Sequence, residues 1–367
     1  MNDILYDRIF SLLSGRQSRA VETMELSAVG SIVGSVRNRN EDVGAVVNVR
    51  HGREPSKDFM LALVCDGMGG MSDGREAALI AASSFVAAAL RNIRSSGTKH
   101  GLTISLASAQ RAVFNELRGN GGTTLSAAYV DKSPQAWLTH VGDSRIYAIN
   151  SANELRQITR DDTIGAALQR EHEKRPDNNR LIQFIGLDGE LDPQLHSFDR
   201  GNLNGLLVTS DGAHSAPVEI LSTIAKHSKT GLELVRKMLN VADALGGLDN
   251  ATAVHIPCAS TGADIPQGDH GQNDDVVVTI LCSSGQHDIW LAPAQRVDIP
   301  SSRSPDSNHQ KPDSSRGDRA AVPASKKAKK PKSPRGSAKN RPQDELPLPI
   351  EKPVAKLDFS DDGDSKS

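Results

Sequence analysis

Carboxylates stand at the ends of apolar runs in this sequence, which is the layout that a metal site needs. The run 63–65 leads into Asp66, which is followed directly by Gly67. A strand would fix the carboxylate, and glycine would let backbone and solvent come close to an ion. Similar acidic positions along the chain are Glu41, Asp42, Asp143, Asp211 and Asp249. We expect these side chains, far apart in sequence, to converge in space.

Oxygen ligands of this kind suit hard divalent cations such as Mg²⁺ and Mn²⁺. Two such ions about 3.5 to 4 Å apart can share a carboxylate and acidify a water held between them. Their remaining coordination positions can orient the oxygens of a phosphoryl group, so the pattern favours hydrolysis of phosphate monoesters. Arg37, four residues before Glu41, is the candidate for a bidentate grip on the phosphate.

The elements that must position these residues follow from the apolar pattern. Short apolar runs between Gly, Asn, Asp or Ser clusters predict strands at 28–36, 43–49, 59–66, 124–130, 135–141, 144–150, 205–209 and 251–256. Helical spacing predicts helices at 75–92, 104–117, 218–225 and 232–244. Runs of strands with pairs of helices between them indicate an α+β fold, in which two packed antiparallel β-sheets are flanked by helices in an α-β-β-α sandwich.

Composition divides the chain of 367 residues into four parts. Residues 1–26 form a leader with a short amphipathic helix, which packs on the main domain or engages a partner. Residues 27–258 form the catalytic domain. Residues 259–300 hold a linker rich in Gly, Asp and Gln and then an extra β-hairpin. Residues 301–367 are rich in Ser, Pro and Lys and poor in large apolar residues, so we expect a disordered tail.

Charge, cysteine content and hydropathy argue against several classes of protein. The net charge of -2 gives no general reason to expect nucleic acid or membrane as partner, although the basic run 326–332 could dock to an anionic surface. The three cysteines form no CxxC pair, which argues against a zinc site or a disulfide framework. No apolar run reaches the roughly 18 residues of a membrane helix, and no signal peptide is recognisable. We expect a cytoplasmic monomer.

Six motifs follow one another between residues 27 and 258. They are GSVRNRNED (34–42), VCDGMGG (64–70), GTT (122–124), VGDSR (141–145), TSDG (209–212) and DNAT (249–252). In this order they resemble the motifs of the metal-dependent PPM protein phosphatases, the type 2C serine/threonine class, in their bacterial form. One such motif is weak evidence, whereas six in order are specific. The resemblance implies a two-sheet fold and hydrolysis of phosphoserine and phosphothreonine by a metal-activated water.

The resemblance also implies the ligands of two core ions, Mn²⁺ or Mg²⁺. Asp66 would bridge both ions. Glu41 and the carbonyl of Gly67 would complete one site, and Asp211 and Asp249 would complete the other.

Further roles are implied by the same resemblance. Asp143 would serve a third, weaker metal ion, Asp42 would support a metal-bound water, and Arg37 would bind the substrate phosphate. The implied partners are phosphoproteins, together with a cognate serine/threonine kinase or that kinase's substrates.

Three positions depart from the family pattern. Met68 stands where many eukaryotic members have a histidine proposed as general acid. Ser215 stands where an acidic residue commonly helps the third ion, and Asp162 stands where a histidine is usual. We expect a weakened third site and a leaving group that takes its proton from water or from another group.

The neighbouring residues are expected to have structural roles, and a non-catalytic function remains an alternative for the whole chain. Arg145 is expected to pair with a carboxylate, His140 and His214 to be structural, and Cys65 to be packed in a strand. A different class of function is a non-catalytic sensor or scaffold that keeps this fold and acts through its tail and hairpin.

Overall fold

The computed structural model describes residues 3–15, 19–68, 73–169, 176–258 and 276–291. The predicted linker and the predicted disordered tail at 301–367 lie outside the described residues. Everything described below lies within residues 3–291, which belong to one compact unit.

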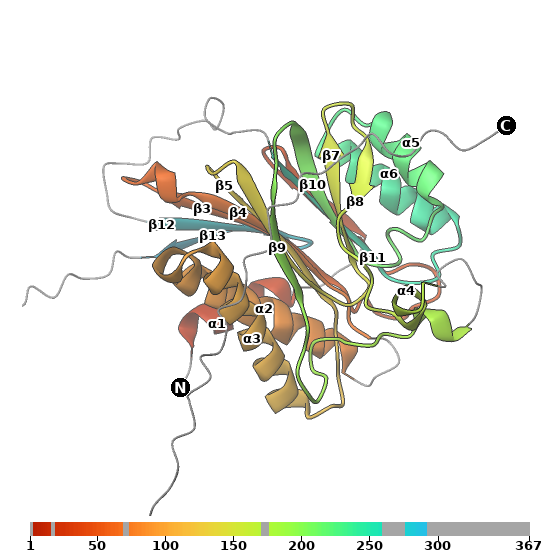
Figure 1. Cartoon of the computed structure of the whole chain (residues 1–367), viewed down its shortest axis with the longest axis horizontal. Helices are drawn as coiled ribbons and strands as arrows, with labels where there is room; N and C mark the ends of the chain where they lie inside the picture. The colour runs from red at the N-terminus through yellow and green to blue at the C-terminus, as the bar shows by residue number, and fades with distance from the viewer. Residues whose placement is uncertain (1–2, 16–18, 69–72, 170–175, 259–275, 292–367) are drawn as a thin grey trace, which may run out of the picture. The chain divides into compact units, whose positions relative to one another are not determined.

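Two antiparallel sheets form the centre of this unit (Figure 1). The first sheet has six strands, whose order is β1 (Ala20–Met24), β2 (Ser27–Ile32), β11 (Ala251–Pro257), β10 (Leu203–Thr209), β7 (Arg145–Asn150) and β8 (Leu155–Gln157). The second sheet has seven, in the order β13 (Gly285–Leu291), β12 (Val276–Cys282), β3 (Val43–His51), β4 (Phe59–Cys65), β5 (Leu125–Asp131), β6 (Gln135–Val141) and β9 (Gln194–Asp199).

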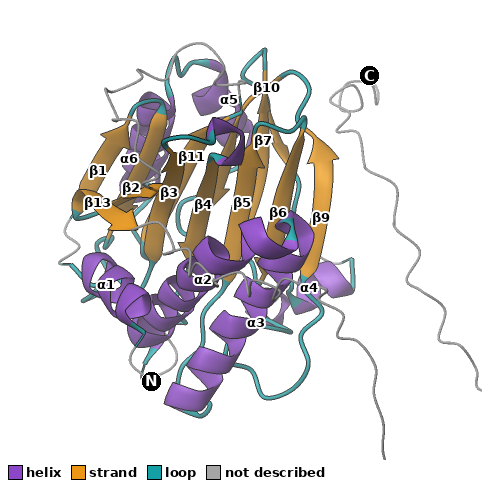
Figure 2. Ribbon diagram, turned by 90° about the vertical axis from the view of Figure 1, so that its left-hand side faces the viewer, coloured by secondary structure: helices purple, strands orange, loops and turns teal. Residues whose placement is uncertain are grey.

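Helices cover the outer faces of both sheets, as Figure 2 shows for the seven-stranded sheet. That sheet packs against α1 (Ile4–Leu13), α2 (Gly74–Ser96) and α3 (Thr98–Leu117). The six-stranded sheet packs against α5 (Val218–Lys226) and α6 (Gly231–Ala244). The predicted α+β class, with two packed antiparallel sheets flanked by helices, is confirmed.

Strand β4 illustrates why these residues form a central strand. Leu61, Leu63 and Cys65 face the helices, while Ala62 and Val64 face the other sheet. Side chains alternate between the two faces of a strand, and here both faces are buried, so the whole run is apolar. The same alternation through neighbouring strands fills the space between the sheets.

Helix α2 is long and apolar enough to cross a membrane by length and composition. Most of its apolar window is buried inside the protein, against the seven-stranded sheet and α3. Its small residues, among them Ala77, Ala78, Ala81 and Ala82, are fully buried and let the helix lie close to the strands. This is the packing of a core helix.

Two segments that the sequence placed in flanking parts are joined to the sheets. Strand β1, in the predicted leader, pairs with β2, and the predicted hairpin forms β12 and β13, of which β12 pairs with β3. Strands β1, β8 and β9 were not predicted, because they are short or only partly apolar. The predicted helix of the leader is α1, whose Ile9 and Leu13 are buried.

The hairpin therefore contributes to the hydrophobic core, and its removal should cost stability. Ile280 in β12 is fully buried with α1 and α2, whereas Trp290 in β13 is 61% exposed. We expect Ile280→Ala to lower the free energy of unfolding by about 2 to 5 kcal/mol. Trp290→Ala should change it by less than about 1 kcal/mol. Urea denaturation measures both, and equal effects of the two changes would contradict this description.

Candidate active site

The register of the strands brings the acidic motifs to one end of the two sheets. In the seven-stranded sheet Val43 lies opposite Cys65, and Leu125 lies opposite Val141. In the six-stranded sheet Arg145 lies opposite Thr209. The carboxylates come one or two residues beyond these ends, at Asp42, Asp66, Asp143 and Asp211, with Asp249 two residues before β11.

Asp66 is held by the GTT motif that precedes β5. The Asp66 N–H donates to Thr124 Oγ1 at 2.9 Å, and the Asp66 carbonyl accepts from the Thr124 N–H and the Thr123 hydroxyl, each at 2.9 Å. Gly67 then passes so close to its neighbours that an added Cβ would lie 2.4 Å from the Gly74 carbonyl oxygen and 2.7 Å from that of Glu41. A side chain at position 67 would push these segments apart, so glycine is required here.

Asp42 connects the two sheets from a fully buried position. The Ser210 hydroxyl donates to Asp42 Oδ2 at 2.8 Å and accepts from the Thr252 N–H at 2.9 Å. Asn250 Oδ1 accepts from the Glu41 N–H at 2.8 Å. The TSDG and DNAT motifs therefore fix the acidic pair as well as supplying their own carboxylates.

Two arginines of the first motif lie against carboxylates of the cluster. Arg37 Nη2 is 2.6 Å from Asp249 Oδ2, and Arg39 is 2.6 Å from Glu41 Oε1. Glu41 is buried, and the Arg37 side chain is 37% exposed. The structure thus places Arg37 beside a predicted metal ligand, with part of its guanidinium open to solvent.

Asp143 sits in a tight turn that Asp162 supports. The Gly142 N–H donates to Asp162 Oδ2 at 2.9 Å, and the Asp162 N–H donates to the Gly142 carbonyl at 2.7 Å. Gly142 has a φ of 111° and packs on Thr124, so the turn suits glycine. Next to it, Arg145 binds both carboxylate oxygens of Asp161, the pairing that the sequence predicted. This supporting role of Asp162 was not predicted.

Mutual repulsion and loss of hydration raise the pKa values of these carboxyls. Burial raises the pKa of Asp66 well above its usual range, and the charges of Asp42, Asp211, Asp143 and Asp249 add to the shift. Burial also raises the pKa of Asp42 to about 7 and, with the charge of Asp211, that of Asp143 to about 7. The carboxylates are therefore close enough to sense one another strongly.

The donor set fits a hard cation in kind. The set consists of carboxylates and a closely packed backbone. A bound divalent cation would neutralise the negative charge of the carboxylates. Within the described ranges, no three His, Cys, Asp or Glu side chains are grouped tightly enough to hold an ion as they stand. Asp211 is exposed and Asp66 half-buried, so the cluster opens to solvent. The ligand assignments remain predictions.

The remaining titratable groups nearby are structural, as the sequence predicted. His140 is fully buried with its Nδ1 2.7 Å from Ser126 Oγ, and burial lowers its pKa. His214 lies 2.9 Å from Thr209 Oγ1, and burial lowers its pKa strongly. Cys65 is buried, which raises the pKa of its thiol.

Comparison with known proteins places this arrangement in context. No protein-family model matches the chain. A protein of Mycoplasma pneumoniae named "Putative protein phosphatase" is 31% identical over 152 residues, which cover 38% of this chain and 56% of that protein. The chain thus matches little more than half the length of this relative.

Solved structures match over more of the chain. PppA, a regulatory component of the T6SS in Pseudomonas aeruginosa, is 27% identical with a TM-score of 0.50, covering 62% of this chain and 95% of that one. The PPM Ser-Thr phosphatase MsPP of Mycobacterium smegmatis is 25% identical with a TM-score of 0.50 (63% and 97% covered). Stp1 of Staphylococcus aureus is 22% identical with a TM-score of 0.55 (66% and 98% covered).

The fold is that of the bacterial serine/threonine phosphatases. The chain is similar in fold to a PPM enzyme of this class, MsPP, in agreement with the resemblance of its six motifs.

The negative charge of the Asp143 carboxylate should destabilise the folded, metal-free protein at high pH. The pKa of Asp143 is raised to about 7 from 3.8, so its carboxylate is less favourable in the folded than in the unfolded state. In EDTA at pH 8, Asp143→Asn should therefore raise the free energy of unfolding, by up to about 4 kcal/mol. The gain should shrink below pH 7 and vanish below about pH 4, where both states are protonated.

Urea denaturation of both proteins across this pH range provides the measurement. Asp188→Asn, which alters an exposed carboxylate, is the matched control and should show no such gain. A stability difference for Asp143→Asn that does not change with pH would contradict the prediction.

Proposed function

We propose that this protein is a metal-dependent phosphatase of phosphoserine and phosphothreonine in proteins. The observation that carries the proposal is the convergence of the strand-end carboxylates beside Arg37, where burial and then the neighbouring charges raise the pKa of Asp66. Its likeness to PPM phosphatases supports the same activity. The non-catalytic alternative is not favoured, because every implied ligand position holds a carboxylate or, at Gly67, a carbonyl.

In this proposal two divalent ions would be held by Asp66, together with Glu41 and the Gly67 carbonyl for one ion and Asp211 and Asp249 for the other. Mn²⁺ or Mg²⁺ bound there would neutralise phosphate charge and acidify a water for attack on phosphorus. Asp143 would serve a third ion.

The remaining groups act by holding and orienting. Asp42, fixed by the Ser210 hydroxyl, would accept a hydrogen bond from the attacking water. Arg37 contacts Asp249 without a substrate, and we infer that it turns its guanidinium to the phosphate oxygens once a cation takes over the Asp249 charge. Position 68 carries a methionine, so the proton for the leaving serine or threonine oxygen comes from another donor.

The substrates proposed are phosphoproteins, with a cognate serine/threonine kinase or its targets among them. A cytoplasmic location and a monomeric state also remain proposals.

The bridging carboxylate gives the most direct test of activity. Asp66→Asn keeps the size of the side chain but halves its capacity to bind two cations. We expect the manganese-dependent hydrolysis of p-nitrophenyl phosphate and of a phosphothreonine peptide to fall by about a thousandfold or more. The measurement is the turnover of both substrates at a concentration of MnCl₂ of about 1 mM.

The control is Glu219→Gln, which neutralises an exposed carboxylate on α5. It should retain full activity, and circular dichroism should show that both variants are folded. Persistence of wild-type turnover in Asp66→Asn would refute the proposed reaction.

The role of Arg37 can be separated from that of its neighbour Arg39. Loss of a charge-assisted hydrogen bond to phosphate costs about 1.5 to 3 kcal/mol, so Arg37→Gln should raise KM for p-nitrophenyl phosphate by about 10- to 100-fold. Arg39→Gln, which removes the partner of Glu41, should raise KM by less than about threefold. Steady-state kinetics at saturating Mn²⁺ measure both. If Arg37→Gln weakens Mn²⁺ affinity and leaves KM unchanged, Arg37 serves Asp249 and not the phosphate.

A further inference from the structure

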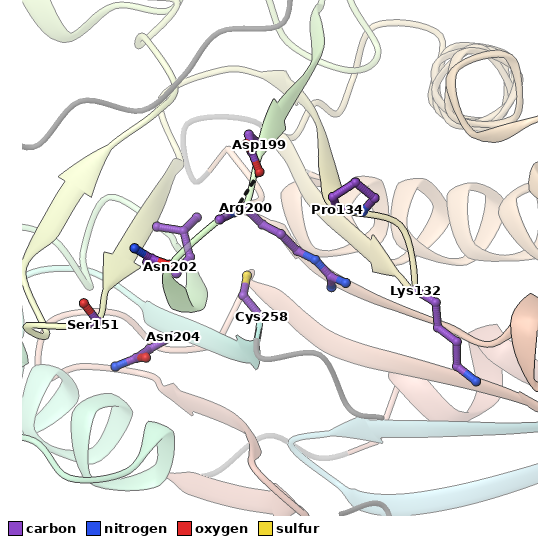
Figure 3. A pocket seen from close by; sticks show the side chains of 10 residues that line it. Lys132, Pro134, Ser151, Asp199, Arg200, Asn202, Asn204 and Cys258 are labelled. Atoms are coloured by element: carbon purple, nitrogen blue, oxygen red, sulfur yellow. Dashed lines mark hydrogen bonds between the residues drawn. The ribbon is translucent and has the colours of Figure 1, made fainter. Parts of the chain in front are cut away.

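A second polar site lies at the end of the sheets opposite the acidic cluster. Strands β5, β7 and β11 begin near the cluster and end at Asp131, Asn150 and Pro257, while β10 begins at this far end. A pocket of about 580 Å³ opens here, and Figure 3 shows the side chains that line it. Strands of seven residues separate the two sites by roughly 20 Å. The pocket is therefore distinct from the proposed active site.

Arg200 is the residue of this pocket that requires an explanation. It is only 8% exposed, yet its side chain lines the pocket and reaches across from the turn between β9 and β10 toward the loop of Pro134 (Figure 3). Within the described part of the chain, its guanidinium has no hydrogen-bond or ion-pair partner. A guanidinium stays charged at any physiological pH, so one that faces a pocket without a protein partner is available to bind an anion.

The guanidinium of Arg200 reaches the solvent of the pocket, because none of its nitrogens is among the fully buried, unpartnered side-chain atoms of the described residues. Arg200 is nevertheless nine-tenths buried as a whole residue. Its backbone is fixed on both sides, because its N–H donates to the Pro134 carbonyl at 3.0 Å and its carbonyl accepts from the Leu203 N–H at 2.7 Å. The side chain is thus held at the pocket.

The other lining groups are mostly suited to an oxyanion. Lys132 supplies a second cation, and Ser151 and Asn202 supply neutral donors at the exposed rim. Asp199 is the one carboxylate in the lining, and its Oδ1 accepts the Gly201 N–H at 2.9 Å, which commits that oxygen to the turn.

Cys258 does not provide reactive chemistry in this pocket. It is 3% exposed, and burial raises the pKa of its thiol to about 12 although the charge of Arg200 opposes the shift. The thiol therefore stays protonated and forms part of the wall. The binding chemistry lies in the cations.

We propose that this pocket is a second, non-catalytic site that binds a phosphate group through Arg200, with Lys132 adding positive charge at the exposed rim. The planar guanidinium donates paired hydrogen bonds to two oxygens of a phosphate, which matches its shape and charge. The phosphate can be free or carried by a protein segment, and the volume of the pocket accommodates either. The inference goes beyond the proposed phosphatase activity and does not depend on it.

The test is a titration of the full-length protein in EDTA, so that phosphate ester hydrolysis does not interfere. Inorganic phosphate should shift the backbone amide NMR resonances of Gly201, Asn202 and Leu203 in a saturable manner. Arg200→Gln should weaken the apparent affinity at these amides at least about tenfold, and Arg200→Lys should give an intermediate value because it keeps charge without the paired donors. Arg37→Gln should leave these shifts unchanged.

Asp199→Asn should tighten binding about two- to fivefold, because it removes the negative charge of the lining. A phosphoserine peptide that binds at least tenfold tighter than inorganic phosphate would identify a protein segment as the source of the phosphate, and equal affinity would identify the free ion. The proposal is overturned if these amide resonances do not shift at about 20 mM phosphate, a concentration that would occupy even a site with a dissociation constant in the millimolar range. It is equally overturned if folded Arg200→Gln and Arg200→Lys bind as wild type does.

Discussion

The accumulation of negative charge at one end of two packed sheets is the constraint on which this structure depends. Burial raises the pKa values of Asp66, Asp143 and Asp211, and the charge of at least one neighbouring carboxylate adds to each shift, so the fold must hold together groups that repel. It does so with backbone and hydroxyl hydrogen bonds, of which those to Asp66 and Asp42 are the clearest. A site that is unfavourable without cations is one that binds them strongly.

The rest of the fold supplies the rigidity that this arrangement needs. Apolar strands such as β4 are buried on both faces, and antiparallel registers fix where each strand ends. Loops of a few residues then carry the carboxylates, so a small shift of one strand would misplace its ligand. The hairpin of β12 and β13 extends the seven-stranded sheet beyond β3, and the leader helix α1 packs on that sheet.

Much of the fold and of the site could be predicted from local pattern. Apolar strand ends with an adjacent carboxylate were visible at Asp66 and Asp211, and the alanine-rich α2 showed helical spacing. Strands β1 and β9 were missed because partly exposed edge strands lack a clear alternation. The support of Asp143 by Asp162 depends on a contact 20 residues away, and the burial of Arg200 depends on three separate turns. Such tertiary contacts leave no periodic pattern in the sequence.

The central claim is that the acidic cluster exists to hold divalent cations, and crystals grown with MnCl₂ test it most directly. Diffraction at the manganese absorption edge should give two strong anomalous peaks on either side of the Asp66 carboxylate. Asp211 and Asp249 should contact one peak, and Glu41 and the Gly67 carbonyl should contact the other. An ordered cluster with no anomalous peak at Asp66, or with Arg37 still paired to Asp249 at saturating Mn²⁺, would contradict the account.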